Sequence, residues 1–207
     1  MGINGEKSVK LGDIVDFGGY AWRVLDIQDG QALLLSELVL ENRPYNEKYG
    51  SITWEKCTLR HYLNGEFYEK FSAADRKRIV RTDVKNDDNQ WFGTDGGNDT
   101  ADYVFLLSLE EVVRYFGGDV EGRLKKPHTN LWKSYFGDDF MGKRFAKNAN
   151  GKRTDWWLRS PGIYPHYATR IMDYGIDIGG LDADSTFYGE DDYVGEGGVR
   201  PALWLNL

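Results

Sequence analysis

The sequence predicts an α+β domain with small twisted antiparallel sheets, flanking helices and long loops. Three features carry this prediction: a β-meander in residues 12–38, amphipathic helical stretches in the middle of the chain, and two strand-like aromatic segments near its end. With 207 residues, 41% of them hydrophobic, the chain can bury a sizeable core. It has no internal repeat and no low-complexity linker, so we expect a single domain over residues 1–207.

The first strands are marked by their turns. The dipeptide Asp29-Gly30 between two apolar runs is a strong signal for a type I′ hairpin, and residues 16–20 (DFGGY) offer a second tight turn. Tyr20, Trp22 and Val24 alternate with the residues between them, which favours a strand with one buried face.

Three helices are predicted between residues 53 and 117. Thr53 is the expected N-cap of the first helix, and Asn64-Gly65 is its expected C-terminal stop. Ser72 begins a capping box for a short helix that ends near Val80, and Ser108 begins a clearer one. The core-facing residues expected on the first and third helices are Leu59, Tyr62, Leu63, Leu109, Val112, Val113 and Phe116. Residues 83–102 and 117–153 are expected to be long irregular segments, the first of them functional or mobile.

The C-terminal part of the chain has a different character. Residues 156–160 predict a strand followed by a turn at 160–162, and residues 199–205 predict another strand, in which Pro201 indicates an edge or a bulge. Arg159 and Arg200 are expected to be structural, each bridging backbone carbonyls or an acid. The side chains expected to hold this scaffold are Trp156, Trp157, Val199, Ala202, Leu203 and Trp204.

Charge and cysteine content argue against several classes of function. The net charge of −7 and the sequence pI of 5.1 disfavour a nucleic-acid partner, because phosphate binding needs clustered Lys and Arg. Cys57 is the only cysteine, which excludes an intramolecular disulfide and a cysteine-based zinc site. No apolar run reaches membrane-spanning length, and the first residues lack a signal-peptide pattern. We expect no membrane insertion. The expected location is the surface of a cell or a phage particle, and the alternative is the cytoplasm.

A catalytic or metal-binding constellation is missing from the sequence. Residues 182–186 open like a calcium-binding loop, but Phe187 and Tyr193 stand where an EF-hand needs Gly and a bidentate acid. Residues 95–99 (DGGND) could still bind a cation through oxygen atoms. The pair Asp191-Asp192 is more typical of a solvated loop than of a glycosidase. The histidines lack metal-ligand spacing: His61, His128 and His166. We expect no enzyme activity and no cofactor.

Two C-terminal motifs resemble a known family. They are residues 156–162 (WWLRSPG) and 197–205 (GGVRPALWL), and upstream strings in residues 22–25, 33–37 and 54–64 extend the likeness over nearly the whole chain. The sequence is similar to a bacterial family of uncharacterised domains that resembles the formylglycine-generating-enzyme (sulfatase-modifying-factor-like) branch of the C-type lectin fold. This resemblance implies a C-type-lectin-like scaffold. Formylglycine-generating enzymes bind copper with a pair of cysteines, and this chain has only Cys57, so their activity is not implied.

Variable proteins of diversity-generating retroelements share this fold, and their template adenines are randomised. Randomising the first two bases of an AAY codon cannot yield Lys, Gln, Glu, Trp or Met. Residues 163–196 contain no Lys, Gln or Trp, with Met172, Glu190 and Glu196 as the exceptions. The resemblance therefore implies a variable binding region between residues 156 and 204. The alternative is an acidic, turn-rich loop that lacks Lys by chance.

The surface predicted for this region is rich in Tyr and Asp. Tyrosine offers large amphipathic contacts with little side-chain entropy to lose, and Asp pairs with basic groups of a partner. The expected partner is a protein or a glycan, although some of the tyrosines are expected to be core residues instead. The predicted ligand-binding residues are Tyr164, His166, Tyr167, Arg170, Asp173, Tyr174, Asp177, Asp182, Asp184, Phe187, Tyr188, Asp191 and Tyr193.

Two other functions remain open from the sequence. A structural or assembly domain of a phage or cell-surface complex would expose an apolar patch for self-association. A carbohydrate-active enzyme would need two carboxylates facing one cleft at a definite separation.

Overall fold

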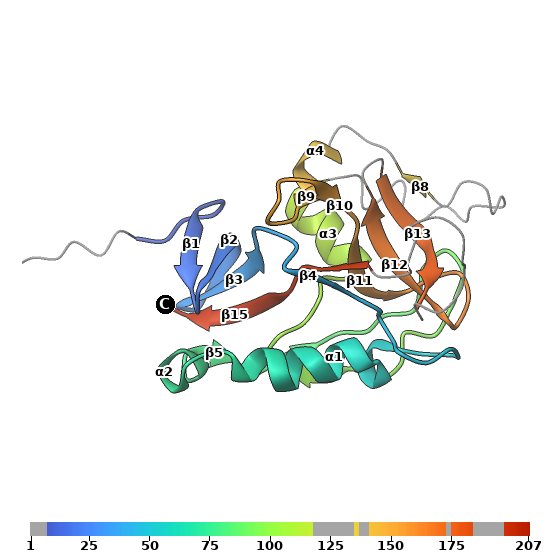
Figure 1. Ribbon diagram of the computed structural model, residues 1–207, viewed down its shortest axis with the longest axis horizontal. Coiled ribbons are helices and arrows are strands. Elements are labelled where there is room, and N and C mark those ends of the chain that lie inside the picture. The colour runs from blue at the N-terminus through green and yellow to red at the C-terminus, as the bar shows by residue number, and fades with distance from the viewer. Residues whose placement is uncertain (1–7, 118–134, 137–140, 173–174, 184–196) are drawn as a thin grey trace, which may run out of the picture.

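The computed structural model describes residues 8–117, 135–136, 141–172, 175–183 and 197–207 (Figure 1). Among these residues the chain forms two main sheets, built mostly from antiparallel pairs, together with several short helices. The predicted mixture of small antiparallel sheets and flanking helices is confirmed. No helix in the described ranges is long and apolar enough to cross a membrane.

The first sheet brings the end of the chain back to its beginning. Its strand order is β1-β2-β3-β15-β5, and all neighbours are antiparallel. Asp29 (φ 49°) and Gly30 (φ 77°) both have positive φ, as a type I′ turn requires, which confirms the β2–β3 hairpin. The strands are β1 (Ile14–Phe17), β2 (Tyr20–Gln28), β3 (Gln31–Ser36), β15 (Ala202–Asn206) and β5 (Ile79–Val80).

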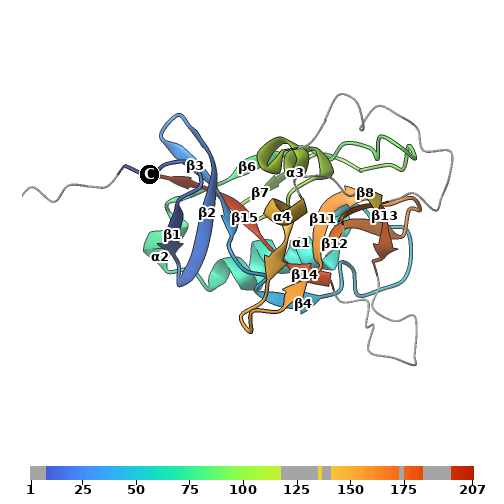
Figure 2. The same ribbon diagram turned by 90° about the horizontal axis from the view of Figure 1, so that it is seen from above.

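The second sheet lies at the other end of the molecule from β1 and β2 (Figures 1 and 2). Its order is β4-β14-β11-β12-β13-β8, and the pairing of β11 with β14 is parallel. Gly197 and Gly198 are required in β14, because a Cβ there would lie 2.3 Å from the Trp157 ring or from the Asp155 carbonyl oxygen. The strands are β4 (Glu41–Arg43), β14 (Gly197–Val199), β11 (Trp156–Pro161), β12 (Tyr167–Met172), β13 (Gly175–Asp182) and β8 (Tyr135–Phe136).

Residues 199–205 do not form the single strand that the sequence predicts. The segment contains the end of β14 and the start of β15, which belong to different sheets, and the chain crosses between them at Arg200 and Pro201. Proline has no N–H to give to a ladder, whereas the Pro201 carbonyl accepts a hydrogen bond from Ser36 N (2.9 Å). Pro201 thus marks a passage between sheets.

The first helical run differs from the prediction at both ends. Thr53 makes no side-chain cap, and Cys57 caps α1 instead, with its Sγ accepting from Arg60 N at 3.4 Å. The predicted stop at Asn64-Gly65 is wrong, because the helix continues through a π-helical turn. The amide of Asn64 donates to the carbonyls of Arg60 and Val104. The run consists of η1 (Trp54–Lys56), α1 (Thr58–Tyr62) and η2 (Leu63–Phe67), and it passes beneath β15 in Figure 1.

Both predicted serine caps are confirmed. Ser72 Oγ accepts from Asp75 N at the start of α2 (Ala73–Arg76), and Ser108 forms a complete capping box with Glu111 at the start of α3 (Leu109–Phe116). The helix α2 ends before Val80, because Ile79 and Val80 pair with β15 as strand β5. A fourth helix, α4 (Met141–Arg144), precedes the hairpin of β9 (Ala146–Lys147) and β10 (Arg153–Thr154).

The predicted long loop of residues 83–102 has paired ends. Strands β6 (Thr82–Val84) and β7 (Thr100–Asp102) form a small antiparallel hairpin, and residues 85–99 connect them. Buried residues within the connection show that it is packed against the rest of the protein: Asn86, Asn89, Trp91 and Thr94 are each at most 9% exposed.

One set of buried apolar side chains joins both sheets and the helices. Its largest members are Trp22, Trp54, Trp156 and Trp157, each at most 1% exposed. Of the residues expected to hold the C-terminal scaffold, Val199, Ala202 and Leu203 are fully buried and Trp204 is partly buried, so this prediction is confirmed.

Candidate functional site

An exposed group of aromatic side chains lies on the turn between β11 and β12. Tyr164, His166 and Tyr167 of this turn meet Tyr49 from the segment between β4 and η1, and we call these four residues the aromatic cluster. The His166 ring lies 5.3 Å from the Tyr49 ring, 5.7 Å from Tyr164 and 4.8 Å from Tyr167, measured between centroids. Tyr49 is 67% exposed and Tyr164 is 46% exposed, so both side chains are open to solvent.

Backbone hydrogen bonds hold both segments that carry the aromatic cluster. Within the turn, Tyr167 N donates to Tyr164 O (2.9 Å), and Gly162 N donates to Tyr167 O (2.7 Å). Ile52 N donates to Pro165 O (2.8 Å), which ties the Tyr49 segment to the turn. Gly162 is required, because a Cβ there would lie 2.4 Å from the Gly179 carbonyl oxygen. The aromatic rings therefore stand on an ordered backbone, which lowers the entropy lost when a ligand binds.

Side chains of the 85–99 connection hydrogen-bond to the backbone of this turn. Asn89 is 2% exposed, and its side-chain amide donates to Pro161 O (2.8 Å) and to Ile178 O (3.0 Å). Thr94 Oγ1 donates to Ile163 O at 3.1 Å. The sequence predicts that this loop is functional or mobile. These contacts indicate that it holds the turn in place.

Two predicted ligand residues belong to an internal ion-pair network instead. The Arg170 guanidinium lies 3.2 Å from Asp177 Oδ2 and 3.1 Å from Asp155 Oδ2. Asp177 is 2% exposed and also accepts from Gly180 N, so the expectation of a ligand-contacting Asp177 is wrong. Arg170 pairs across the strands with Asp177 in the β12–β13 register, which explains why the two charges meet. Their contacts stabilise the hairpin that carries the aromatic cluster.

Fewer of the predicted ligand-binding residues reach the surface than the sequence suggests, because strands β12 and β13 are largely buried. Among residues 163–172 and 175–183, Tyr164 and Pro165 are exposed, whereas Ile171, Ile176 and Ile178 are core residues. Asp182 ends β13 and is described by its backbone alone. The remaining predicted ligand residues lie outside the described residues: Asp173, Tyr174, Asp184, Phe187, Tyr188, Asp191 and Tyr193.

Sequence reasoning missed one member of the aromatic cluster. Tyr49 lies in a polar segment with no strand or helix pattern, and only the fold brings it beside His166. The signal in the sequence was an aromatic residue between Lys48 and Gly50, in a polar segment typical of a loop.

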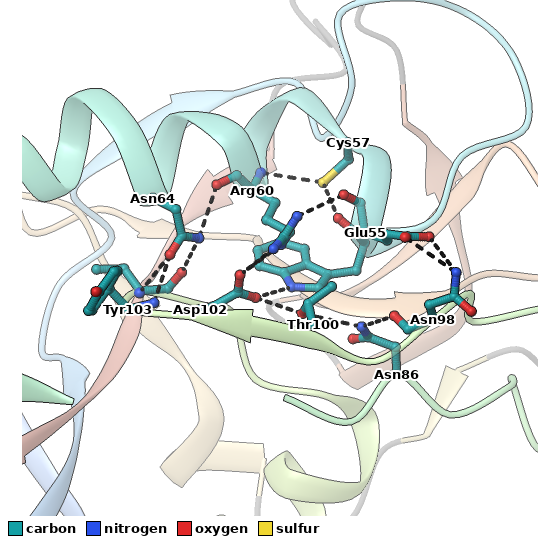
Figure 3. Close-up of polar contacts among 11 residues, drawn as sticks. Glu55, Cys57, Arg60, Asn64, Asn86, Asn98, Thr100, Asp102 and Tyr103 are labelled. Atoms are coloured by element: carbon teal, nitrogen blue, oxygen red, sulfur yellow. Dashed lines mark hydrogen bonds and ion pairs between the residues drawn. The ribbon is translucent and has the colours of Figure 1, made fainter. Parts of the chain in front are cut away.

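A second group of polar side chains, centred on Asp102 and Arg60, is buried beside α1 (Figure 3). The Asp102 carboxylate accepts from Trp54 Nε1 (2.9 Å) and Thr100 Oγ1 (2.8 Å) and pairs with the Arg60 guanidinium (2.7 Å). Arg60 also donates to the Glu55 carbonyl at 2.9 Å. These internal partners occupy the polar atoms, so the cluster fastens α1 to β7. Nearby, burial raises the pKa of the Cys57 thiol to about 12, which keeps it protonated at neutral pH.

Two acidic residues of segment 95–99, considered above as a segment that could bind a cation, make internal contacts. Asp95 Oδ1 accepts from Gly97 N, and Asp99 accepts from Asn86 N while pairing with Lys85. Within the described ranges no three His, Cys, Asp or Glu side chains gather as metal ligands.

Arg159 and Arg200 are both buried, as the sequence predicts for structural residues. Arg159 donates to the carbonyls of Lys85 (3.0 Å) and Leu106 (2.7 Å) and pairs with Glu111, which links β11 to α3. Arg200 donates to the Ser36 carbonyl at 2.9 Å.

Comparison with known proteins gives one match. The profile described as a domain of unknown function (DUF6273) matches residues 29–207, which run from the β2–β3 turn to the end of the chain. No curated protein and no solved structure matches the sequence. The matched range includes every described strand except β1 and β2, together with all four residues of the aromatic cluster, and the chain therefore belongs to the DUF6273 family.

Proposed function

We propose that this protein is a non-catalytic recognition domain with a C-type-lectin-like fold, and that it binds a protein or glycan ligand through the aromatic cluster. Small, mostly antiparallel sheets together with several short helices are compatible with this fold. The resemblance of residues 156–162 and 197–205 to the formylglycine-generating-enzyme branch also supports it.

One observation carries the proposal: exposed tyrosines stand on a backbone that is fixed before binding. Tyr49 and Tyr164 both pack against His166, and both tyrosine side chains are exposed to solvent. Tyrosine is enriched among the residues that dominate binding energy, because it buries a large area and still makes hydrogen bonds. A ligand that stacks on these rings loses little loop entropy from the protein.

Alanine substitution of Tyr49 and Tyr164 tests this proposal. Ligands are first selected for the wild-type protein from a phage-displayed random peptide library and from an array of bacterial surface glycans. The Tyr49→Ala/Tyr164→Ala protein is expected to bind them about 10-fold or more weakly, because each truncated anchor removes roughly 1–2 kcal/mol. Surface plasmon resonance measures the change.

Ile14→Ala is the matched control for this experiment. Ile14 is 54% exposed on β1, at the other end of the molecule, so its loss removes exposed apolar area without touching the aromatic cluster. Ligand affinity equal in the double variant and in Ile14→Ala would refute recognition by the aromatic cluster.

We further propose that residues 163–196 contain the variable region of a diversity-generating retroelement. The coding segment for residues 156–204 should then have a near-duplicate beside a reverse-transcriptase gene. Differences between the two copies are expected at codons for exposed or half-buried positions such as Tyr164, His166 and Tyr167, and not at those for core residues such as Ile171 and Ile178. Sequencing the surrounding genome decides this. The absence of a duplicate, or differences spread equally over core codons, would contradict the proposal.

A further inference from the structure

A surface groove lies apart from the aromatic cluster. It is a groove of about 630 Å³ between the start of β2 and the helices α3 and α4. Ligand pockets commonly have volumes of 300–1,000 Å³. Its lining includes the charged residues Arg23, Glu37, Lys143 and Arg200 and the apolar residues Leu25 and Tyr115. Figure 1 shows β2, α3 and α4 on one side of β11, and β12 and β13 on the other.

Arg200 lines this groove as a buried cation. Its residue is 2% exposed, and its Nε donates to the Ser36 carbonyl at 2.9 Å. Its Nη1 makes a longer contact, 3.5 Å, to the carbonyl of Arg144. The guanidinium lies 4.9 Å from the Trp156 ring centroid and 5.9 Å from that of Phe116. These partners are dipoles and ring faces, so none of them neutralises its charge.

Glu37 is the acid with the largest electrostatic effect on Arg200, but its carboxylate pairs with Arg23. Glu37 lines the groove, but its two carboxylate oxygens accept from Arg23 Nε (2.8 Å) and Arg23 Nη2 (2.6 Å). Within the described residues Arg200 has no carboxylate at ion-pair distance. Burial lowers the pKa of Arg200 to about 10, against a smaller attraction to Glu37. Buried charges in proteins are generally paired, because an unpaired one carries a large desolvation cost.

We propose that this groove binds a small organic anion, whose carboxylate pairs with Arg200 and whose apolar part packs on the partly buried side chains of Leu25 and Tyr115. A guanidinium can hold a carboxylate through parallel N–H donors, and shielding from water strengthens such a pairing. The apolar lining gives the rest of the ligand a surface to bury. Arg200 gives the groove a local positive charge, although the chain as a whole has a net charge of −7.

Benzoate is the probe for the first test, with benzyl alcohol as its uncharged match. Each is titrated into ¹⁵N-labelled protein at constant ionic strength, and the indole N–H signals and arginine Nε–H signals are followed by NMR. Trp156 Nε1 donates to the Arg144 carbonyl beside Arg200, so its signal reports on the groove. We expect saturable shifts of the Trp156 and Arg200 signals with benzoate and none with benzyl alcohol. Equal responses to both probes, or no saturation with benzoate, would overturn the proposal.

Two variants with opposite expected effects complete the test. Glu37→Gln removes the negative charge that faces the groove and releases Arg23, so benzoate should bind about 3-fold more tightly. Arg200→Gln should abolish saturable binding, and Arg81→Gln is the matched control because Arg81 is exposed and does not line the groove. If Arg200→Gln fails to fold, the wild-type titrations and Glu37→Gln still decide. Unchanged or weaker binding by Glu37→Gln counts against the anion site.

Discussion

Replacing Asp102 with alanine is expected to lower the free energy of unfolding by about 3–5 kcal/mol, the range for removing one partner of a buried ion pair. Asp102 is fully buried and accepts hydrogen bonds from Trp54 and Thr100 while it pairs with Arg60. Alanine leaves these donors without an acceptor and detaches α1 from β7. Guanidinium unfolding at pH 7, followed by tryptophan fluorescence, measures the loss.

Asp83→Ala is the control for the Asp102 substitution. Asp83 is exposed on the neighbouring strand β6, so its removal should change stability by no more than about 0.5 kcal/mol. Asp102→Asn keeps one acceptor oxygen but points an NH₂ group at the existing donors, so its loss should fall between the other two. Equal stability of Asp102→Ala and Asp83→Ala would show that this cluster does not fasten α1.

Features set by local chemistry were predictable from the sequence. The Asp29-Gly30 turn needs two positive φ angles, and Ser108 with Glu111 closes a capping box, so a few adjacent residues determine each structure. The end of the first helical run was not predictable in this way. Asn64 and Gly65 usually stop a helix, but here the Asn64 side chain binds the backbone of Tyr103 and Val104, which only the fold brings near.

The same distinction applies to the candidate site. Composition pointed to the segment of Tyr164, His166 and Tyr167, but it could not tell which face of β12 and β13 each residue occupies. Asp177 was therefore assigned to the surface, whereas its register with Arg170 makes it a buried ion-pair partner. Tyr49 was missed because its place in the cluster depends on a tertiary contact, the hydrogen bond from Ile52 N to Pro165 O.

Asn89→Ala is expected to destabilise the protein by about 2–6 kcal/mol, because four hydrogen bonds disappear and each contributes roughly 0.5–1.5 kcal/mol. The Asn89 amide donates to Pro161 O and Ile178 O, and its Oδ1 accepts from Trp91 N and Phe92 N. Asn98→Ala is the matched control, since Asn98 is exposed in the same loop and its side chain bonds to Glu55 at the surface.

The Asn89 substitution also tests whether the 85–99 connection orders the aromatic cluster. The rings of Tyr164, His166 and Tyr167 pack against one another, so the NMR proton shifts of His166 carry ring-current contributions from both tyrosines. With Pro161 O and Ile178 O no longer held together, the turn should sample more conformations, and the His166 shifts should move toward random-coil values. A stability loss with unchanged His166 shifts would assign the order of the cluster to the backbone bonds of the turn alone. Movement of those shifts, together with weaker binding of the selected ligands, would mean that the polar loop beneath the turn sets the geometry of recognition.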